Sequence, residues 1–369
     1  MSRGGAAPLN RLLPPQDPQR PLGADVFRAM AVGMVGWFHI WQQTWINPGP
    51  LQLAVRTGYI WVDGMILLSA FCLWLPYARA RAARGGFPGC EGFWRRRALR
   101  ILPCYYAVVL FALLLALRSE GWSAGLGKDL AAHLTLTQQL YRPAYLACQL
   151  NGVTWTLTVF ALFYLVFPLL APLCAKWPLP TLAALGLVQL GYTRWLLPQY
   201  GSGDYSARFN QLPAFSGVLA VGLAAAWVFA KFAHGGWAQH VLPRAGCTAL
   251  GLAALIWLDA EMRAQAAAAE YQQFQLINRM PLVLAAAAVL VCFGLGLTLP
   301  GVLRRALRWL AALTYSFYLW HQMLTVFLKY DLHLPAWAGD TPPIRVGDAA
   351  WMHRADLLYW AAALAVSIA

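Results

Sequence analysis

Ten long apolar segments, separated by short polar loops, constrain this chain more than any other feature of its sequence. Each is close to the roughly 20 residues that an α-helix needs to cross a hydrocarbon core of about 30 Å. Within hydrocarbon, a helix satisfies its own backbone hydrogen bonds. We therefore predict an all-α, polytopic integral membrane protein with about ten transmembrane helices. The predicted segments lie at roughly 25–45, 58–78, 101–118, 152–173, 179–197, 212–232, 245–260, 280–299, 309–329 and 356–369.

Composition agrees with this prediction and argues against other classes of protein. Sixty per cent of the residues are hydrophobic and only 11% are charged, whereas soluble domains have about 25% charged residues. The net charge of +14 would suit a nucleic-acid-binding protein, but the basic residues gather in loops between apolar segments, as the positive-inside rule predicts. The seven cysteines show no metal-ligand spacing, so neither a disulfide framework nor a metal site is expected.

The distribution of arginine predicts the orientation of the chain. The densest basic block lies between the second and third apolar segments and marks a cytoplasmic loop. This places the N-terminus in the cytoplasm, with residues 1–22 as a short tail and 23–369 as one transmembrane domain. The last segment, Leu357 to Ala369, offers only about 20 Å of helix, which suggests a C-terminally truncated helix. The arginines of the basic block are Arg79, Arg81, Arg84, Arg95, Arg96, Arg97 and Arg100.

The first segment carries two ionisable residues, Arg28 and His39. A spacing of 11 residues is three helical turns plus about 20°, so both side chains lie on one face, about 16 Å apart. Arg28 alone reads as a cation that reaches the inner interface. A histidine within a membrane helix usually faces the interior of the bundle, where it would either form a structural hydrogen bond or act as a general base.

Asp63, in the second segment, lies one to two turns below the outer surface, where it would either orient His39 or be hydrated at the interface. Arg97 and Arg100 share a helix face at the inner end of the third segment. Guanidinium groups bind phosphate in a bidentate manner. The same pair would also suit contact with lipid head groups.

The ninth segment carries a polar stripe of Thr314, Tyr318 and His321, at positions i, i+4 and i+7. A second intramembrane histidine favours a wet site inside the bundle. Two histidines would also suit a proton relay in a transporter.

Five stretches occur in an order and in spans that resemble the acyltransferase-3 family of bacterial membrane acyltransferases. They are "FRAMAVGMVGWFHIW", "GYIWVDGMILLSAF", "FWRRRALRILPCYY", "WTLTVFALFYLVFPLL" and "YSFYLWH", and the resemblance runs from about Leu22 to the last segment. It implies an O-acyltransferase in the bacterial plasma membrane. Such an enzyme moves an acyl group, commonly acetyl, from a cytoplasmic acyl-CoA to a hydroxyl of an extracytoplasmic carbohydrate, with no permanently bound cofactor.

The resemblance also implies roles for individual residues. A basic residue, ten intervening positions and a histidine form the family's first-helix signature, which Arg28 and His39 match. Arg97 and Arg100 match an Arg-x-x-Arg signature at the inner end of the third helix, with a role in donor binding. Arg28 is grouped with them, and His39 becomes the general base.

Four further positions follow from the same resemblance. Asp63 matches the aspartate of the second helix, and His321 matches the final histidine of the ninth-helix motif. We expect both in the catalytic site. Trp155 and Tyr318 are further candidates to line the pocket.

The fourth segment departs from the family pattern, because Phe160 occupies the position of a characteristic glutamate. Two alternatives therefore remain: a catalytically inactive homologue, and a transporter or flippase of a polar glycoconjugate. Transporters often contain inverted repeats, which the sequence does not show.

Overall fold

The computed structural model describes residues 21–44, 49, 52–334 and 354–368, which form helices joined by turns, with no strand among them. Short 3-10 turns precede several of the helices. The predicted tail, residues 1–22, lies almost wholly outside the described residues. The helices are α1 Leu22–Thr44, α2 Gln52–Arg56, α3 Trp61–Ala82, α4 Phe93–Ser119, α5 Ala124–Leu134, α6 Arg142–Leu146, α7 Trp155–Lys176, α8 Pro178–Leu196, α9 Tyr205–Phe209, α10 Ser216–His234, α11 Val241–Ala267, α12 Tyr271–Gly296, α13 Gly301–Tyr330 and α14 Arg354–Ile368.

Each predicted apolar segment overlaps a helix, which confirms the all-α prediction. Among the described residues, six helical stretches are long and apolar enough to cross a membrane, so the chain has the character of a multi-pass membrane protein. The count of ten spans and the side of the N-terminus remain predictions. The six stretches are Gly58–Ala82, Phe93–Ser119, Gly152–Lys176, Leu212–His234, Val241–Ala267 and Tyr271–Gly296.

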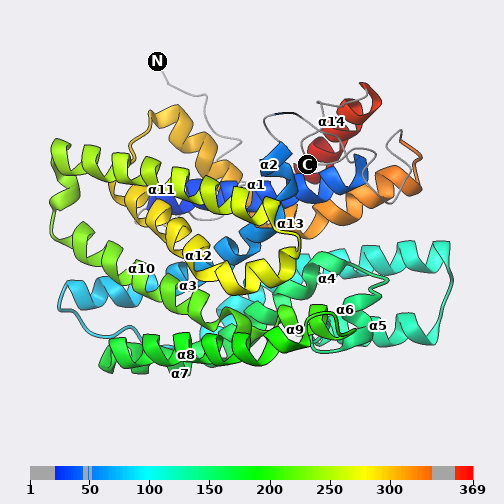
Figure 1. Cartoon of the computed structure of the whole chain (residues 1–369), viewed down its shortest axis with the longest axis horizontal. Helices are drawn as coiled ribbons and strands as arrows, with labels where there is room; N and C mark the ends of the chain where they lie inside the picture. Colours follow the sequence, from blue (N-terminus) through cyan, green and yellow to red (C-terminus); the bar gives the residue numbers. More distant parts are fainter. Residues whose placement is uncertain (1–20, 45–48, 50–51, 335–353, 369) are drawn as a thin grey trace, which may run out of the picture.

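Most of the long helices run roughly along the long axis of the molecule, which is horizontal in Figure 1. The connection between α3 and α4 lies at the left of this view, and α5 lies at the right. α1 packs against α3, α12 and α13, while α10 packs against α3, α8 and α12. α1 and α3 therefore lie where several helices meet, which is where the sequence placed the candidate site.

α4 and α11 turn much of their surface outward. Leu110 on α4 is 57% exposed and Ile256 on α11 is 74% exposed. Exposed apolar side chains on helices of spanning length match a lipid-facing surface. In α3, by contrast, most of the apolar window is buried inside the protein, so this helix forms part of the core.

Two close helix contacts depend on the absence of a side chain. A Cβ atom at Gly36 would come within 2.5 Å of the Phe317 ring on α13, and one at Gly222 on α10 would come within 2.4 Å of the Leu67 carbonyl oxygen on α3. Small residues allow such approaches between helices in membranes. Gly36 thus brings α1 and α13 together beside His39.

Candidate functional site

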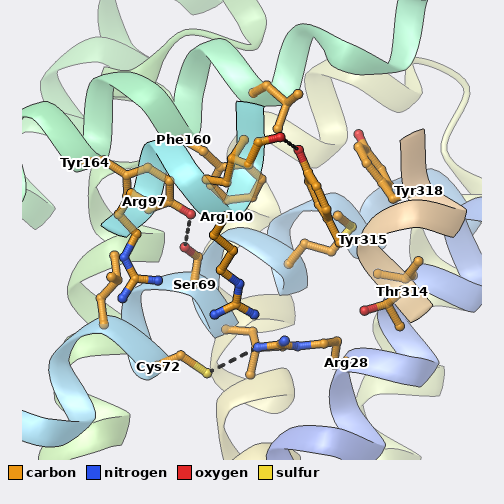
Figure 2. Close-up of a pocket in the computed structure, with 16 residues that line it drawn as sticks. Arg28, Ser69, Cys72, Arg97, Arg100, Phe160, Tyr164, Thr314, Tyr315 and Tyr318 are labelled. Carbon is orange, nitrogen blue, oxygen red and sulfur yellow. Dashed lines mark hydrogen bonds between the residues drawn. The ribbon is translucent and has the colours of Figure 1, made fainter. Parts of the chain in front are cut away.

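Three arginines from two helices converge on a cavity of about 170 Å³. Arg28 comes from α1, and Arg97 and Arg100 come from the first turns of α4. Figure 2 shows the three side chains extending into the same space. The structure thus brings together the three residues that we predicted to bind the donor.

Local geometry explains how α4 presents its arginines. Gly92 adopts φ 62°, a left-handed conformation that glycine tolerates, immediately before the helix begins. Arg97 and Arg100 follow at a spacing of three residues and share a face. Arg97 lies over the Phe93 ring at 5.4 Å, and its buried Nε atom has no hydrogen-bond partner. The guanidinium therefore retains donor capacity for a ligand.

No carboxylate is found among the described residues that line this cavity. Phe160, which occupies the position of the family glutamate, is part of the wall and stacks on Tyr164 with an interplanar angle of 16°. Three cations, with no anion among the described lining residues, give the cavity a positive potential. Its remaining walls are largely apolar, so it suits a ligand with an anionic group and an uncharged arm.

The two predicted histidines lie side by side, although they are 282 positions apart in the chain. The ring centroids of His39 on α1 and His321 on α13 are 5.2 Å apart. Phe317 stacks on His321 with an interplanar angle of 8°. The predicted polar stripe of α13 therefore does face the interior, next to His39.

Hydrogen bonds assign the imidazole protons. His321 Nδ1 lies 2.8 Å from the Tyr318 carbonyl oxygen, which only accepts, so this nitrogen carries the proton. Its Nε2 is buried and has no partner. In the same way, His39 Nδ1 lies 3.0 Å from Gln42 Oε1 and donates to it, while Gln322 Nε2 approaches the same atom at 3.5 Å. Both histidines then keep a lone pair on Nε2, as a base requires.

His39 faces a second and larger cavity, of about 540 Å³. Trp155, one of the predicted pocket residues, lines it together with Asp63. The polar part of the wall consists largely of amide side chains, which donate and accept hydrogen bonds, and the remainder is rich in aromatic rings. These groups are Asn210, Gln265, Gln272 and Gln275, with Phe38, Trp41, Tyr59, Phe209, Phe215 and Tyr271.

Tyr318, the other predicted pocket residue, lines the arginine cavity instead. Its hydroxyl donates to the Val153 carbonyl oxygen at 2.8 Å and lies 2.8 Å from the Thr156 hydroxyl. Arg28 and His39 therefore lie in two separate cavities. Val32 lines the first and Val35 the second, one turn apart on α1.

Asp63 does not contact His39. Its Oδ2 atom accepts from Arg279 Nε at 3.0 Å, and both side chains are 1% exposed. Gln275 Nε2 lies 3.5 Å from the same oxygen. The prediction that Asp63 orients His39 therefore needs correction: Gln42 fills that position, and Asp63 neutralises a buried cation. Asp63 still lines the His39 cavity.

Arg279 is the main feature that our sequence reading missed. It donates to the Ala214 carbonyl oxygen at 2.7 Å and lies over the Phe215 ring at 4.4 Å. α12 is kinked at Asn278, next to Pro281, as expected where proline removes a helical hydrogen bond. The sequence did contain a signal for a buried functional arginine at this position: Arg279 lies two residues before Pro281, at the edge of an apolar run.

The described residues thus form a helical bundle with membrane-spanning stretches, a cationic cavity near one end of α1 and a pair of histidines near the other. The family model for the acyltransferase domain of the acyltransferase-3 family matches residues 22–369, essentially the whole chain. The protein therefore belongs to the acyltransferase-3 family and is a membrane acyltransferase by descent. No curated protein and no solved structure matches the chain.

Proposed function

We propose that the protein is a plasma-membrane O-acyltransferase that transfers an acetyl group from a cytoplasmic acyl-CoA to a hydroxyl of an extracytoplasmic glycan. The observation that carries this proposal is the arrangement on α1. A three-arginine cavity without a carboxylate lies at Arg28, and two adjacent histidines lie about 16 Å further along the helix at His39.

The donor's phosphates suit the arginine cavity. Arg28, Arg97 and Arg100 offer planar, permanently charged groups that match phosphate oxygens. The apolar remainder of the wall suits the uncharged pantetheine arm, whose thioester extends past Val32 and Val35 toward His39. No residue with a negative charge competes for the arginines within the described lining.

His39 is the proposed general base. Gln42 holds its Nδ1 proton and leaves Nε2 free to accept the proton of an acceptor hydroxyl. His321 keeps its own Nε2 lone pair in a dry environment next to it. The hydroxyl oxygen then attacks the thioester carbonyl carbon, and coenzyme A leaves as a thiol.

The acceptor is proposed to enter the 540 Å³ cavity around His39. Its combination of amide side chains and aromatic rings offers hydrogen bonds to hydroxyls and flat apolar surfaces. Apart from Asp63, which is paired with Arg279, no acidic residue is found in its described lining. Arg56 also lines the cavity, over the Trp41 ring at 5.6 Å. A polar acceptor such as a sugar suits this chemistry, and Arg56 would accommodate an anionic substituent on it.

The release of coenzyme A thiol by the purified protein, in the presence of membrane glycolipid extracts, tests the proposal. The His39→Ala variant should lose acyl transfer while still inserting into the membrane. Arg97→Gln should raise the KM for acyl-CoA at least tenfold, whereas Arg95→Gln, outside the cavity on the same helix, should not.

If the wild-type protein releases no thiol above background, the proposal of an acyltransferase fails. The protein would then be a transporter or an inactive homologue. Full activity in His39→Ala would exclude His39 as the base. The alternative of an inactive homologue rests on Phe160, which lines the donor cavity at the position of the family glutamate. Thiol release by the wild-type protein would show that activity does not require that glutamate.

A further inference from the structure

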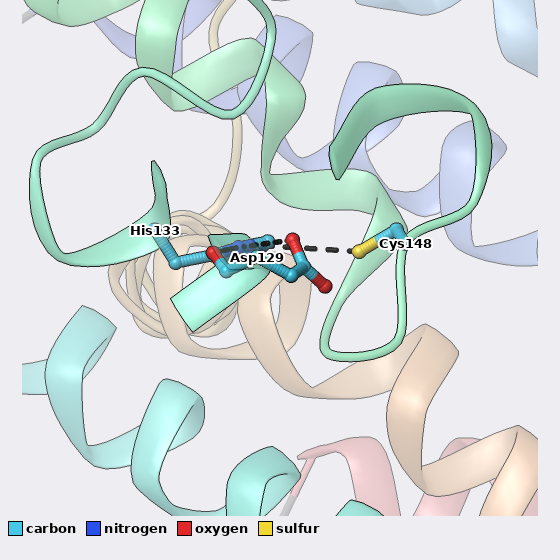
Figure 3. A group of neighbouring side chains, drawn as sticks. All are labelled: Asp129, His133 and Cys148. Atoms are coloured by element: carbon cyan, nitrogen blue, oxygen red, sulfur yellow. Dashed lines mark hydrogen bonds and ion pairs between the residues drawn. The ribbon is translucent and has the colours of Figure 1, made fainter. Parts of the chain in front are cut away.

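A second group of reactive side chains lies outside the proposed acyl-transfer site. Asp129 and His133 are four residues apart on α5, and Cys148 follows α6. Asp129 Oδ1 lies 3.0 Å from His133 Nδ1 as an ion-pair contact, and Nδ1 is hydrogen-bonded to the Asp129 backbone carbonyl oxygen at 2.9 Å. Cys148 Sγ lies 3.9 Å from His133 Nε2. Figure 3 shows the three side chains gathered in one place. We call them the thiol cluster.

Two backbone hydrogen bonds hold the thiol cluster together. Asp129 Oδ2 accepts from the Gln149 backbone N–H at 2.8 Å and from the Leu150 backbone N–H at 3.2 Å. These residues directly follow Cys148, so the carboxylate that touches the imidazole also fixes the thiol beside it. His133 is fully buried and Asp129 is 3% exposed.

The order thiol, imidazole, carboxylate is the arrangement that activates a nucleophile. The imidazole takes the thiol proton, and the carboxylate orients the ring and stabilises its charged form. Burial disfavours a charged ring, but the hydrogen bonds to Asp129 and Cys148 outweigh burial and raise the pKa of His133 to about 10. The ring therefore carries the proton at neutral pH, and the reactive form that we consider is the pair of the His133 imidazolium and the Cys148 thiolate.

A metal ion suits the same geometry less well. The ligand atoms of the three residues lie within 4.8 Å of one another, but the carboxylate meets the imidazole at Nδ1 and the thiol meets it at Nε2. An ion shared with the thiol would sit at Nε2, whereas Asp129 Oδ1 lies beside Nδ1 and Oδ2 already accepts from two backbone N–H groups. Structural and catalytic zinc sites need three or four protein ligands around one ion.

Cys148 also opens onto a cavity of about 360 Å³. Gln322, in the wall of that cavity, approaches His39 Nδ1 at 3.5 Å. A single side chain therefore borders both the proposed base and the cavity that contains the thiol. We propose that Cys148 is a second acyl-accepting site, a nucleophilic thiol that takes an acyl group from a thioester. This inference rests on the proposed function for the source of the acyl group.

The proposed step is a balanced exchange of thioesters. In the proposed reactive pair the proton already lies on His133 Nε2, and the Cys148 sulfur attacks the carbonyl carbon of the donor as the thiolate. A new carbon–sulfur bond forms at Cys148, and the carbon–sulfur bond of the donor breaks. The departing thiolate takes the proton back from His133, so no oxidant or reductant is needed.

The test uses the full chain in detergent and a small thioester, S-acetyl-N-acetylcysteamine, which needs no arginine cavity. Peptide mass spectrometry should find hydroxylamine-sensitive acetyl on Cys148 at least tenfold faster than on any other cysteine. Asp129→Asn should slow this reaction at least tenfold. An amide oxygen still accepts the two backbone hydrogen bonds, so this variant should keep its fold. Cys292→Ser, a change on α12, should react like the wild type.

Three results would overturn the inference: equal labelling of several cysteines, an unchanged rate in Asp129→Asn, or stoichiometric binding of Zn²⁺ that is lost in Cys148→Ser. His39→Ala separates the two proposals. If it retains Cys148 acetylation by the small thioester but loses acyl transfer to the acceptor, both hold. If the wild-type protein acetylates Cys148 but never releases coenzyme A, the proposed function alone fails.

Discussion

Asp63 and Arg279 form an ion pair whose side chains are almost completely buried. Removing one partner from such a pair leaves an uncompensated charge, which costs about 3–5 kcal/mol. Asp63→Asn should therefore lower the free energy of unfolding by about this amount. The double variant Asp63→Asn/Arg279→Gln, which removes both charges, should recover part of the loss. Unfolding titrations with SDS in mixed micelles provide the measurement.

The pair between Arg263 and Asp259 supplies the control. Its Nε–Oδ2 distance is 2.7 Å, but the side chains are 69% and 49% exposed. Exposed pairs contribute about 0–1 kcal/mol, so Asp259→Asn should have little effect. Equal losses in Asp63→Asn and Asp259→Asn would contradict the argument from burial.

His133 predicts a pH dependence of stability. Its folded-state pKa of about 10 lies above the ordinary value of 6.5. The stabilisation is therefore fully present below pH 6.5 and is lost as the pH rises toward 10. The melting temperature of the wild type should exceed that of His133→Gln at pH 6, and this advantage should shrink by pH 10. An advantage that stays constant or grows with pH would exclude the predicted charge state.

The sequence predicted which side chains share a face of one helix better than it predicted which side chains from different helices contact each other. Arg97 and Arg100 share a cavity, and His321 faces inward, because helical periodicity fixes which side chains share a face. The partner of Asp63 depends on how α3 and α12 pack, which no local pattern encodes. The sequence analysis considered His39 as the partner of Asp63 and missed Arg279, which the packing of α12 against α3 brings to that carboxylate.

At the scale of the helix, Gly36 makes the contact between α1 and α13 testable. An added Cβ would meet the Phe317 ring at 2.5 Å, and this ring stacks on His321. Gly36→Ala should therefore lower the free energy of unfolding by about 1–3 kcal/mol and lower acyl transfer by displacing the histidine. Unfolding titrations and thiol release measure the two effects.

Gly33 lies on the same helix, and an added Cβ there would have no neighbour within 4 Å. Gly33→Ala should keep full activity, and its stability should hold or rise because alanine favours helices over glycine. If both variants lose activity equally, the loss comes from α1 itself and not from its contact with Phe317.

Helix existence was predictable from the apolar runs, whereas helix ends were less so. α4 begins at Phe93, well before the predicted residue 101, and α12 begins at Tyr271 instead of 280. In both cases polar or charged residues form the first turns of the helix. Apolarity marks where a helix can lie in lipid, but backbone hydrogen bonding continues beyond that point.

At the scale of the whole molecule, the arginine block predicts which end faces the cytoplasm. Gly86 lies in the connection between α3 and α4, and Ser202 lies in that between α8 and α9, and both are exposed. In a variant with all natural cysteines replaced by serine, Ser202→Cys should react with a membrane-impermeant maleimide in bacterial spheroplasts. Gly86→Cys should react only after lysis. The reverse pattern would mean the opposite orientation.

Under the proposed function, the placement of Arg28 and His39 on one helix determines which donors the protein accepts. An α-helix does not stretch, so about 16 Å of α1 fixes the reach from the anionic end of the donor to its reacting carbon. A carrier with a shortened arm would fall short of His39 however well its phosphates bound. A longer acyl chain changes only the part of the donor beyond the reacting carbon, so the residues around His39 would determine which acyl groups are accepted. The distance along α1 would determine which carriers are accepted.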